Sequence, residues 1–494
     1  MTEAEYADIA AACDRLLRAP DTSLARLAIP ALHFLNEHPS ALAQYASVLT
    51  GTSERRFSIV PKAAIRALRQ LTQTLAAPHP TALPRGPIDV VIVSHLLKPD
   101  QLCQGDDFYF GSLQRQLEAQ GASSLLLLIN HLKADESRRK PQPVPFPRVI
   151  LATTVPPATE VNIWRQCSAA WRVLRREAAR ANHYPDRRLA LLASRQVLSA
   201  SATTNLRMHA AVAAICEAVN PRLVVTTYEG TVAERLIWHA ARRAKRRPLC
   251  VGYQHAMVLE RAHAIRRPVA APGLDCDPDV VLTLGNISHQ ALAARPELQS
   301  VRFIEYGSHR RTALPALPPP RDRIRRCLVL PDASHDECSI LFGFALDCAR
   351  RNSDISFTLR PHPLVDIQML LRRLPFLEKL PGNVFLSVDR PLEQDLAQAR
   401  YCLYRGSSAA LHAARAGIKP YYLARSGELP FDCLFALKDW REIVTSPEAL
   451  VKSIALADQH TDPTAAARVA SSCEQYVSPV RPAAIIELLA MAAR

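Results

Sequence analysis

The hydrophobic positions of this chain alternate between stretches with helical periodicity and short, continuous apolar runs. The helical pattern dominates the start of the chain, over residues 3–18, 24–37 and 62–76. A proline-rich connector, 77–87, follows, and short apolar runs then alternate with amphipathic stretches. Apolar runs of about four to eight residues are typical of strands buried on both faces. Such runs alternating with amphipathic helices predict βαβ units and parallel sheets.

The apolar runs fall into two series of predicted strands. The first series comprises residues 89–94, 123–129, 148–153, 223–227, 249–254, 280–284 and 301–306. The second comprises residues 327–330, 355–359, 384–388, 401–404 and 420–423. The longest helices are expected at 160–180 and 186–219, shorter ones between the other strands, and a last helix at 483–494.

A segment with four prolines in seven residues, 314–320, separates the two series. At 494 residues the chain is expected to contain two or three domains. We therefore predict an α/β protein of two Rossmann-like domains with a helical N-terminal extension. The expected parts are the extension at 1–86, a first α/β domain at 87–312, a second at 321–478, and a terminal helix, 479–494, packing back across the domains.

Charge and cysteine content restrict the classes of partner. The net charge is +15, and arginines cluster at 172–188, 242–247 and 321–326. Each cluster is either a solvated helix face or a contact with an anionic membrane surface, a phosphorylated lipid or a nucleotide. Only 6% of residues are aromatic and none form a stacking ladder on basic strands, which argues against nucleic acid. The twelve cysteines are scattered singly and are expected to be reduced.

Two further patterns bear on location and on metals. The longest apolar run, 210–216, is too short to span a bilayer, and the acidic residues 1–5 do not begin a signal peptide. We therefore expect a cytoplasmic protein. Asp275 and Asp277 form a D-x-D pair, but they precede a predicted strand and are expected in a turn, so no metal site is predicted.

The most informative segment of the second series is 405–420. Its pattern predicts a strand, a tight turn at Gly406, a helix capped by Ser407 and a stop at Gly417. A helix N-terminus beside the fixed cation of Arg405 suits a phosphate group. The alternative is an ordinary βαβ crossover with a well-made cap.

Other polar residues follow predicted strands. Two prolines fix the backbone around His362 in Arg360-Pro361-His362-Pro363, which follows the strand at 355–359. In the first domain, Tyr228 and Glu229 follow one strand, and Tyr253-Gln254-His255 ends the next. If these two strands are adjacent and parallel, Glu229 and His255 emerge at the same sheet edge, where open α/β sheets bind ligands.

Two Rossmann-type domains with anion-binding turns in the second resemble the GT-B glycosyltransferases. The motifs are most similar to those of the Kdo transferases of bacterial capsule synthesis. The matching residues are Gln254-His255, Arg360 to Pro363, Gly406 to Ser408, and Gly417 to Pro420. The resemblance covers residues 220–430, and the first 85 residues have no counterpart in it.

The resemblance implies a metal-independent glycosyltransferase that takes a sugar from a nucleotide-activated donor, CMP-Kdo or a related ulosonic acid in the first instance. The acceptor would be a growing surface polysaccharide, such as capsule or lipopolysaccharide, or a lipid-linked glycan. No cofactor is expected besides the nucleotide sugar, and contact with the inner face of an anionic membrane is a further expectation. The alternatives are a UDP- or GDP-sugar transferase, a CDP-glycerol transferase of the same fold, or a non-catalytic scaffold subunit of a glycan assembly complex.

The resemblance also assigns roles. Glu229 is the expected base or nucleophile, with helix capping as the alternative, and His255 either contacts donor or acceptor or is a buried structural residue. Tyr228, Tyr253 and Gln254 are expected to line the acceptor cleft. The donor nucleotide is expected to contact Arg360, His362, Arg405, Gly406, Ser407, Ser408 and Glu428. Glu428 would bind a ribose hydroxyl, and its alternative is a surface charge.

Overall fold

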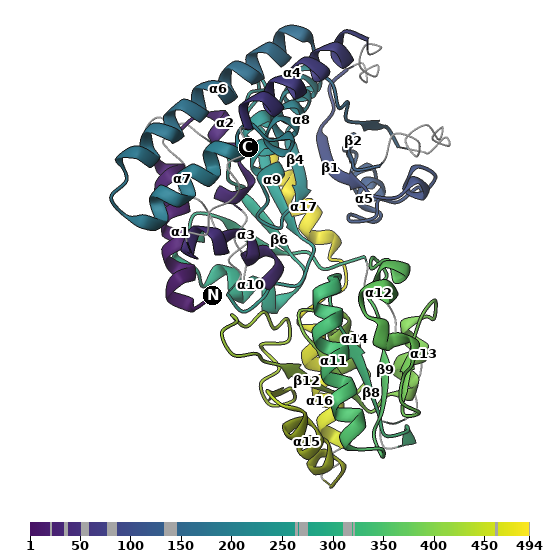
Figure 1. Cartoon of the computed structure of the whole chain (residues 1–494). Coiled ribbons are helices and arrows are strands. Elements are labelled where there is room, and N and C mark those ends of the chain that lie inside the picture. Colours follow the sequence, from purple (N-terminus) through teal and green to yellow (C-terminus); the bar gives the residue numbers. More distant parts are fainter. Residues whose placement is uncertain are drawn as a thin grey trace.

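The computed structural model describes residues 1–19, 22–33, 38–50, 59–76, 86–132, 146–261, 265, 275–309, 319, 322–459 and 463–493. Two α/β domains lie one above the other, and the N-terminal helices pack on the outside of the first (Figure 1). The expected hinge at 314–320 lies outside the described residues except for Pro319, as does the connector at 77–87 except for its last two residues.

The first domain has a parallel sheet that, in the described residues, has seven strands. The strands are β1 (Val90–Leu96), β2 (Ser124–Asn130), β3 (Arg148–Ile150), β4 (Leu223–Thr227), β5 (Leu249–Gln254), β6 (Val280–Thr283) and β7 (Arg302–Glu305). Their order is β3-β2-β1-β4-β5-β6-β7, so the order reverses between β1 and β4. All seven were expected within a few residues, because strands buried on both faces leave continuous apolar runs.

The second domain repeats this topology. Its described strands are β8 (Arg326–Leu330), β9 (Ser356–Leu359), β10 (Val384–Leu386), β11 (Tyr401–Tyr404), β12 (Lys419–Leu423) and β13 (Glu442–Val444). The order is β10-β9-β8-β11-β12-β13, and every pair is parallel. This order, with its reversal between β8 and β11, confirms the predicted fold of two Rossmann-like domains. The pattern missed β13, because only Ile443 and Val444 of this strand are apolar.

Alternate residues of each central strand enter different cores. Val91 and Val93 of β1 face the core shared with the N-terminal helices, whereas Val90 and Ile92 face the opposite core. The first core is covered by α6 (Pro157–Arg180), α7 (Tyr184–Gln196), α8 (Ala200–Val219) and α9 (Val232–Ala241). The opposite core is covered by α5 (Leu113–Ala119) and α17 (Pro482–Ala492). A further helix, α10 (Asn286–Ala293), connects β6 and β7.

The second sheet is likewise covered on both faces. One face packs against α11 (His335–Arg351), α12 (Ile367–Arg373) and α15 (Pro447–Gln459). The other face packs against α13 (Leu392–Gln398), α14 (Ala409–Arg415) and α16 (Pro463–Glu474).

The N-terminal extension forms an additional helical layer on the first domain. Its helices are α1 (Glu3–Arg18), α2 (Leu24–Leu27), α3 (Pro39–Thr50) and α4 (Ile59–Ala76). The single helix expected at 24–37 is wrong: α2 ends at Leu27, and a 3₁₀ turn starts at Pro30, which has no N–H to continue the helix. The single helix expected at 186–219 is also wrong, because Ser199 caps a new helix by accepting a hydrogen bond from the N–H of Ala202.

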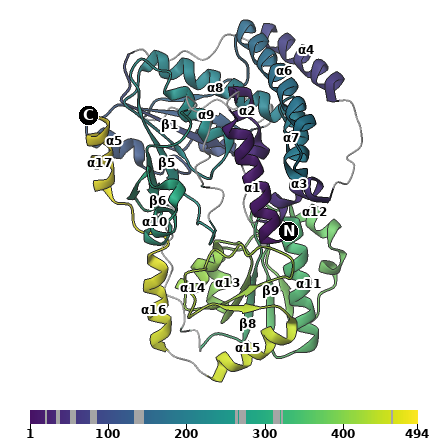
Figure 2. The same cartoon turned by 90° about the vertical axis from the view of Figure 1, so that its left-hand side faces the viewer.

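The chain crosses back between the domains near its end. Helix α16 packs on α14 of the second domain, whereas α17 packs on α5 of the first, and both lie along one side of the molecule (Figure 2). The segment between them passes close to Gly307, whose φ is +88°. A Cβ atom at this position would lie 2.2 Å from the carbonyl oxygen of Pro479, so the crossing requires glycine here.

Candidate active site at the carboxyl edges of the two sheets

Glu229 and His255 meet at the carboxyl edge of the first sheet. Strands β4 and β5 pair in parallel, with Thr227 opposite Tyr253, and the two side chains follow directly after them. The Nε2 atom of His255 lies 3.1 Å from the Oε1 atom of Glu229. The Glu229 side chain is 47% exposed and that of His255 only 6%. The two residues therefore come together as predicted, with the carboxylate on the open side.

A second glutamate holds the turn that carries Glu229. The carboxylate of Glu234 accepts hydrogen bonds from the N–H groups of Glu229, Gly230 and Thr231, at 2.7, 2.9 and 2.8 Å. Thr231 is the N-cap residue of α9, and Glu234 is its buried partner in the capping box. The alternative that Glu229 caps this helix is therefore wrong, and its carboxylate is not used for capping.

His255 is a buried partner of that carboxylate. Its Nδ1 atom is buried and has no hydrogen-bond partner among the described residues. The ring of Tyr109 packs edge-on against the imidazole, with centroids 4.6 Å apart. Because Nε2 faces Glu229 and Nδ1 is buried, the imidazole holds the carboxylate and does not itself face the open side.

Two histidines that the sequence analysis did not select lie beside this pair. The Nδ1 atom of His95 lies 2.9 Å from Nε2 of His131, and its Nε2 atom lies 3.1 Å from the hydroxyl of Thr227. Burial, with a smaller effect from His131, lowers the pKa of His95 to about 4, so this imidazole is neutral at pH 7. His95 is near the end of β1 and His131 directly follows β2, so the rule that selected Glu229 would also have found them.

Asp107 builds the loop that presents Tyr109. Its Oδ1 atom accepts hydrogen bonds from the N–H groups of Tyr109 and Phe110, at 2.8 and 2.9 Å, and from the hydroxyl of Ser94 at 3.0 Å. Burial raises the pKa of the Asp107 carboxyl, and these donors oppose that shift. The loop after β1 therefore has a fixed conformation beside His255.

Three residues expected in the acceptor cleft are in the core instead. Tyr228 is 1% exposed and packs against Trp238. The Tyr253 hydroxyl is buried and donates a hydrogen bond to the carbonyl of Gly307 at 2.9 Å. Gln254 is also buried and accepts a hydrogen bond from the N–H of Leu284 at 3.2 Å. Their expected contact with an acceptor is corrected, because all three side chains are buried inside the domain.

Arg405 is not a free cation at the second sheet edge. Its side chain is buried, its Nη2 atom donates to Glu428, and its Nε atom lies 3.5 Å from Oε2 of Glu337. The guanidinium also stacks on the ring of Phe431 at 4.8 Å. Burial raises the pKa of Glu337 to about 7, and the charge of Arg405 opposes the shift. The expectation of an open phosphate site at Arg405 is therefore corrected. The guanidinium belongs to an internal network of ion pairs with Glu428 and Glu337.

The turn after Arg405 differs in detail from the prediction. Gly406 has a φ of +63°, and a Cβ atom there would lie 2.6 Å from the ring of Phe431, so glycine is required. Helix α14 begins at Ala409, and its N-cap residue is Ser408, not Ser407, without a side-chain capping bond. Ser407 is buried, and its carbonyl accepts a hydrogen bond from the thiol of Cys433.

The second predicted motif is also internally paired. The Nη1 atom of Arg360 lies 2.6 Å from Oδ2 of Asp395, which is buried and also bonded to Ser387. His362 is half-buried, and its Nδ1 atom accepts a hydrogen bond from the N–H of Leu364. Burial lowers the pKa of His362. Arg360 is therefore held by a buried carboxylate, whereas the half-buried side chain of His362 makes a hydrogen bond with a neighbouring backbone N–H group.

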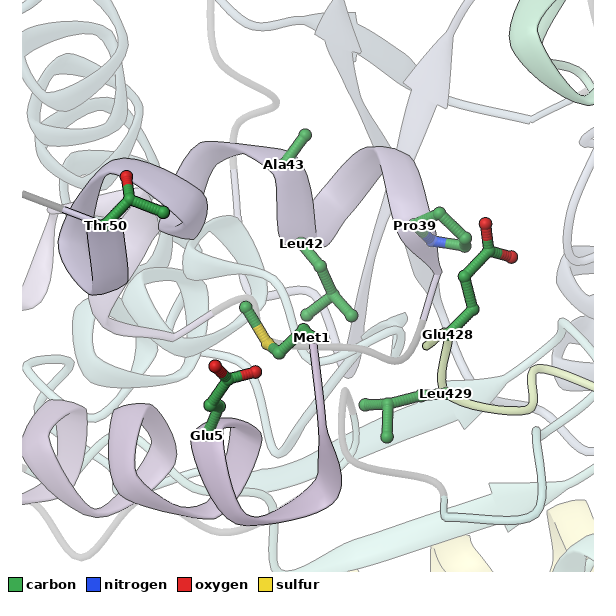
Figure 3. A pocket seen from close by; sticks show the side chains of 8 residues that line it. All are labelled: Met1, Glu5, Pro39, Leu42, Ala43, Thr50, Glu428 and Leu429. Carbon is green, nitrogen blue, oxygen red and sulfur yellow. The ribbon is translucent and has the colours of Figure 1, made fainter. Parts of the chain in front are cut away.

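Glu428 borders a cavity that the N-terminal extension helps to form. The cavity has a volume of about 280 Å³ and is lined by Met1, Glu5, Pro39, Leu42, Ala43, Thr50, Glu428 and Leu429 (Figure 3). Next to it, His38 pairs with Asp332, which follows β8, and its ring packs edge-on against Phe431 at 4.9 Å. Glu428 also pairs with Arg425, at 2.6 Å, so it is more than a surface charge. The sequence pattern did not indicate that the extension contributes to this site.

The carboxyl edges of the two sheets approach each other. Met257 and Leu259, which follow His255, pack against the second-domain core that contains Tyr404 and Leu434. In the other direction, Leu429 belongs to the core of the first domain. The loop after β5, which carries His255, and the loop after β12, which carries Glu428, are therefore neighbours.

Asp275 and Asp277 are used in ion pairs. Asp275 pairs with Arg247, and Asp277 lies 2.7 Å from the buried guanidinium of Arg235. Both precede β6 and so lie at the sheet edge opposite Glu229. Among the described residues, no group of three or more His, Cys, Asp or Glu side chains is arranged to hold a metal ion. None of the helices in the described part is both long and apolar enough to cross a membrane.

No protein-family model and no curated protein matches this chain. Solved structures of related architecture include the glycosyltransferase SnogD from Streptomyces nogalater, with 15% identity and a TM-score of 0.43 over 82% of this chain and 100% of that one. Trehalose-6-phosphate synthase from Burkholderia multivorans has 12% identity and a TM-score of 0.45 over 82% of this chain and 97% of that one. UDP-GlcNAc 2-epimerase from Methanocaldococcus jannaschii has 10% identity and a TM-score of 0.42 over 76% and 94%. These scores are all below 0.5, and we transfer no activity or residue role from them.

Proposed function

We propose that this protein is a glycosyltransferase that moves a sugar from a nucleotide-activated donor to an acceptor hydroxyl, with Glu229 as the base. The observation that carries the proposal is the contact of Glu229 with His255 at the carboxyl edge of adjacent parallel strands. Ligands of open α/β sheets bind at this edge. A half-exposed carboxylate, fixed by a buried imidazole and by the turn that Glu234 holds, has the orientation to accept a proton.

The first domain would bind the acceptor. Transfer to a hydroxyl requires its proton to leave as the bond to the sugar forms, and the Glu229 carboxylate would take it. His95 would be a neutral hydrogen-bonding group at pH 7, because its pKa is about 4. The neutral imidazole avoids placing a second charge beside Glu229.

The second domain would bind the donor nucleotide. The edge of its sheet carries Glu428 beside the cavity under the extension, and the resemblance of its motifs favours CMP-Kdo or a related ulosonic acid as donor. We place the nucleotide against Glu428 and His362, with the Gly406–Ser408 turn nearby. Arg405 would act by holding Glu428 in place, because its own side chain is buried.

No metal enters this proposal. Asp275 and Asp277 lie at the wrong sheet edge, and His362 with backbone N–H groups of the Gly406–Ser408 turn would stabilise the leaving phosphate. Activity is expected to persist in EDTA. A requirement for magnesium or manganese that is lost in EDTA and restored by the ion would contradict this part of the proposal.

A thermal-shift screen with CMP, CDP, UDP and GDP tests the donor side. A nucleotide at about one hundred times its Kd should add about 2.7 kcal/mol to the free energy of unfolding. A response to CMP supports an ulosonic acid donor, whereas a response to UDP, GDP or CDP favours the other transferases of this fold. If the protein binds a nucleotide but shows no turnover, and Glu229→Gln has no effect on the binding, the result would favour a non-catalytic scaffold subunit.

A further inference from the structure

The helix α4 of the N-terminal extension exposes its large apolar side chains to solvent. Ile65, Leu68 and Leu75 are 68%, 66% and 67% exposed. They are separated by three and seven residues, so they lie on one face of the helix. We call these three residues the apolar stripe.

The opposite face of α4 packs on the protein through small and polar residues. Ala63 and Thr74 are buried, and the helix lies along α6, at the end of the molecule away from the second domain (Figures 1 and 2). The Nη2 atom of Arg66 donates a hydrogen bond to the carbonyl of Leu198 at 2.7 Å, which ties α4 to the junction of α7 and α8. The helix is therefore attached by its less apolar face, and the apolar stripe is left for another partner.

The charged side chains of α4 are all basic. Helix α4 contains no Asp or Glu, and Lys62, Arg66 and Arg69 follow one another at helical spacing beside the apolar stripe. The adjoining helix α6 adds the exposed Arg172 and Arg176.

In the other two arginine clusters of the sequence, some arginines are used inside the protein. Arg242 pairs with Asp279 at 2.9 Å, and Arg323 donates to the carbonyls of Ala399 and Ala416. Arg243, Arg246 and Arg247 of the second cluster are exposed, as are the arginines at 172–180 on α6.

We propose that α4 binds the surface of an anionic lipid membrane, with the apolar stripe inserted among the lipids and its basic edge on the headgroups. A helix with an apolar face, a basic flank and no acidic residue has the composition of helices that lie in the membrane interface. Anionic headgroups complement the basic edge. A second copy of this chain is disfavoured as the partner, because two such helices face to face would bring basic edges together.

Sedimentation of the full chain with vesicles tests the proposal. Vesicles of phosphatidylcholine mixed with phosphatidylglycerol should bind the protein, vesicles of phosphatidylcholine alone should bind it less, and added salt should weaken the binding. The variant Ile65→Ser/Leu68→Ser should bind the mixed vesicles at least about tenfold more weakly. Its melting temperature should stay unchanged, because both side chains are already exposed.

Ile486→Ser on α17 is the matched control, because it makes the same change at a helical isoleucine that is 53% exposed on another part of the surface. It should bind like the wild type. The proposal is overturned if the wild type ignores the mixed vesicles, or if the double variant binds them as well as the control. It is also overturned if analytical ultracentrifugation shows a wild-type dimer that the double variant abolishes, because the stripe would then be covered by a second copy.

Discussion

The imidazole of His255 lies behind the carboxylate of Glu229, with 3.1 Å between Nε2 and Oε1, and only the carboxylate is open to solvent. The pair joins the ends of two adjacent strands, so its geometry is set by the sheet and by the turn that Glu234 holds. The charge of Glu229 can be removed without loss of stability, because Glu234 accepts the hydrogen bonds that cap α9.

Replacing Glu229 by Gln should therefore lower turnover without unfolding the protein. The change keeps the size of the side chain and removes the base, and a positioned base is worth about 10²–10⁴ in rate. Turnover and melting temperature of the purified variant are to be measured together. The exposed Glu118→Gln on α5 is the control and should match the wild type in both. Wild-type turnover in Glu229→Gln would remove this residue from the mechanism.

Glu234→Gln should behave differently, with losses in both stability and turnover. The buried carboxylate accepts three backbone N–H groups, and an amide cannot accept all three with the same strength. Weakening these bonds should cost about 1–3 kcal/mol in the free energy of unfolding. Turnover should fall because the turn that carries Glu229 loosens. Urea unfolding and turnover of Glu234→Gln and Glu229→Gln, measured in parallel, distinguish a positioning residue from a base. If Glu234→Gln is as stable as the wild type, the capping carboxylate does not fix this turn.

Arg405→Ala should destabilise the second domain strongly. The substitution leaves Glu337 beside a buried space without its cation and leaves Glu428 with Arg425 alone. Breaking a buried ion pair costs about 3–5 kcal/mol. Arg425→Ala removes another partner of Glu428 whose side chain is 45% exposed, and should cost less than about 1 kcal/mol. Chemical denaturation of both variants provides the test. Equal stability of the two would show that the buried network contributes little.

His95 makes the stability of the protein depend on pH. Because its folded-state pKa is about 4 and the usual value is 6.5, the unfolded chain binds more protons between these pH values. The contribution to stability is complete above pH 6.5 and is lost progressively as the pH falls toward 4. The full loss is about 3 kcal/mol from this group.

The variant His95→Gln should show a flatter dependence of unfolding free energy on pH in this window. Urea denaturation at several pH values between about 4 and 7 measures it. Part of the slope should remain in His95→Gln, because burial also lowers the pKa of His209, to about 3. If the unfolding free energies of His95→Gln and of the wild type change with pH at the same slope, His95 is not a source of this pH dependence.

The sequence alone determined the strands except β13, their division into two series and, given neighbouring parallel strands, the meeting of Glu229 with His255. Strands covered on both faces must be continuously apolar, so their positions can be read directly from the pattern. Once two such strands are parallel neighbours, the residues after them are at one edge, whatever the rest of the chain does. The same local logic identified the turns at Gly406 and Gly417, which have φ values of +63° and +72°.

The tertiary structure alone decided which of the selected polar residues are open to a ligand. Arg405 follows a strand just as Glu229 does, yet Glu428 and Glu337 reach it from other elements and pair with it. Helix α4 is amphipathic in its sequence, but only packing shows that its apolar side faces outward. A periodic pattern records which side chains are apolar along one element. It contains no information on which distant charge or surface will be brought against them, because that depends on long-range packing.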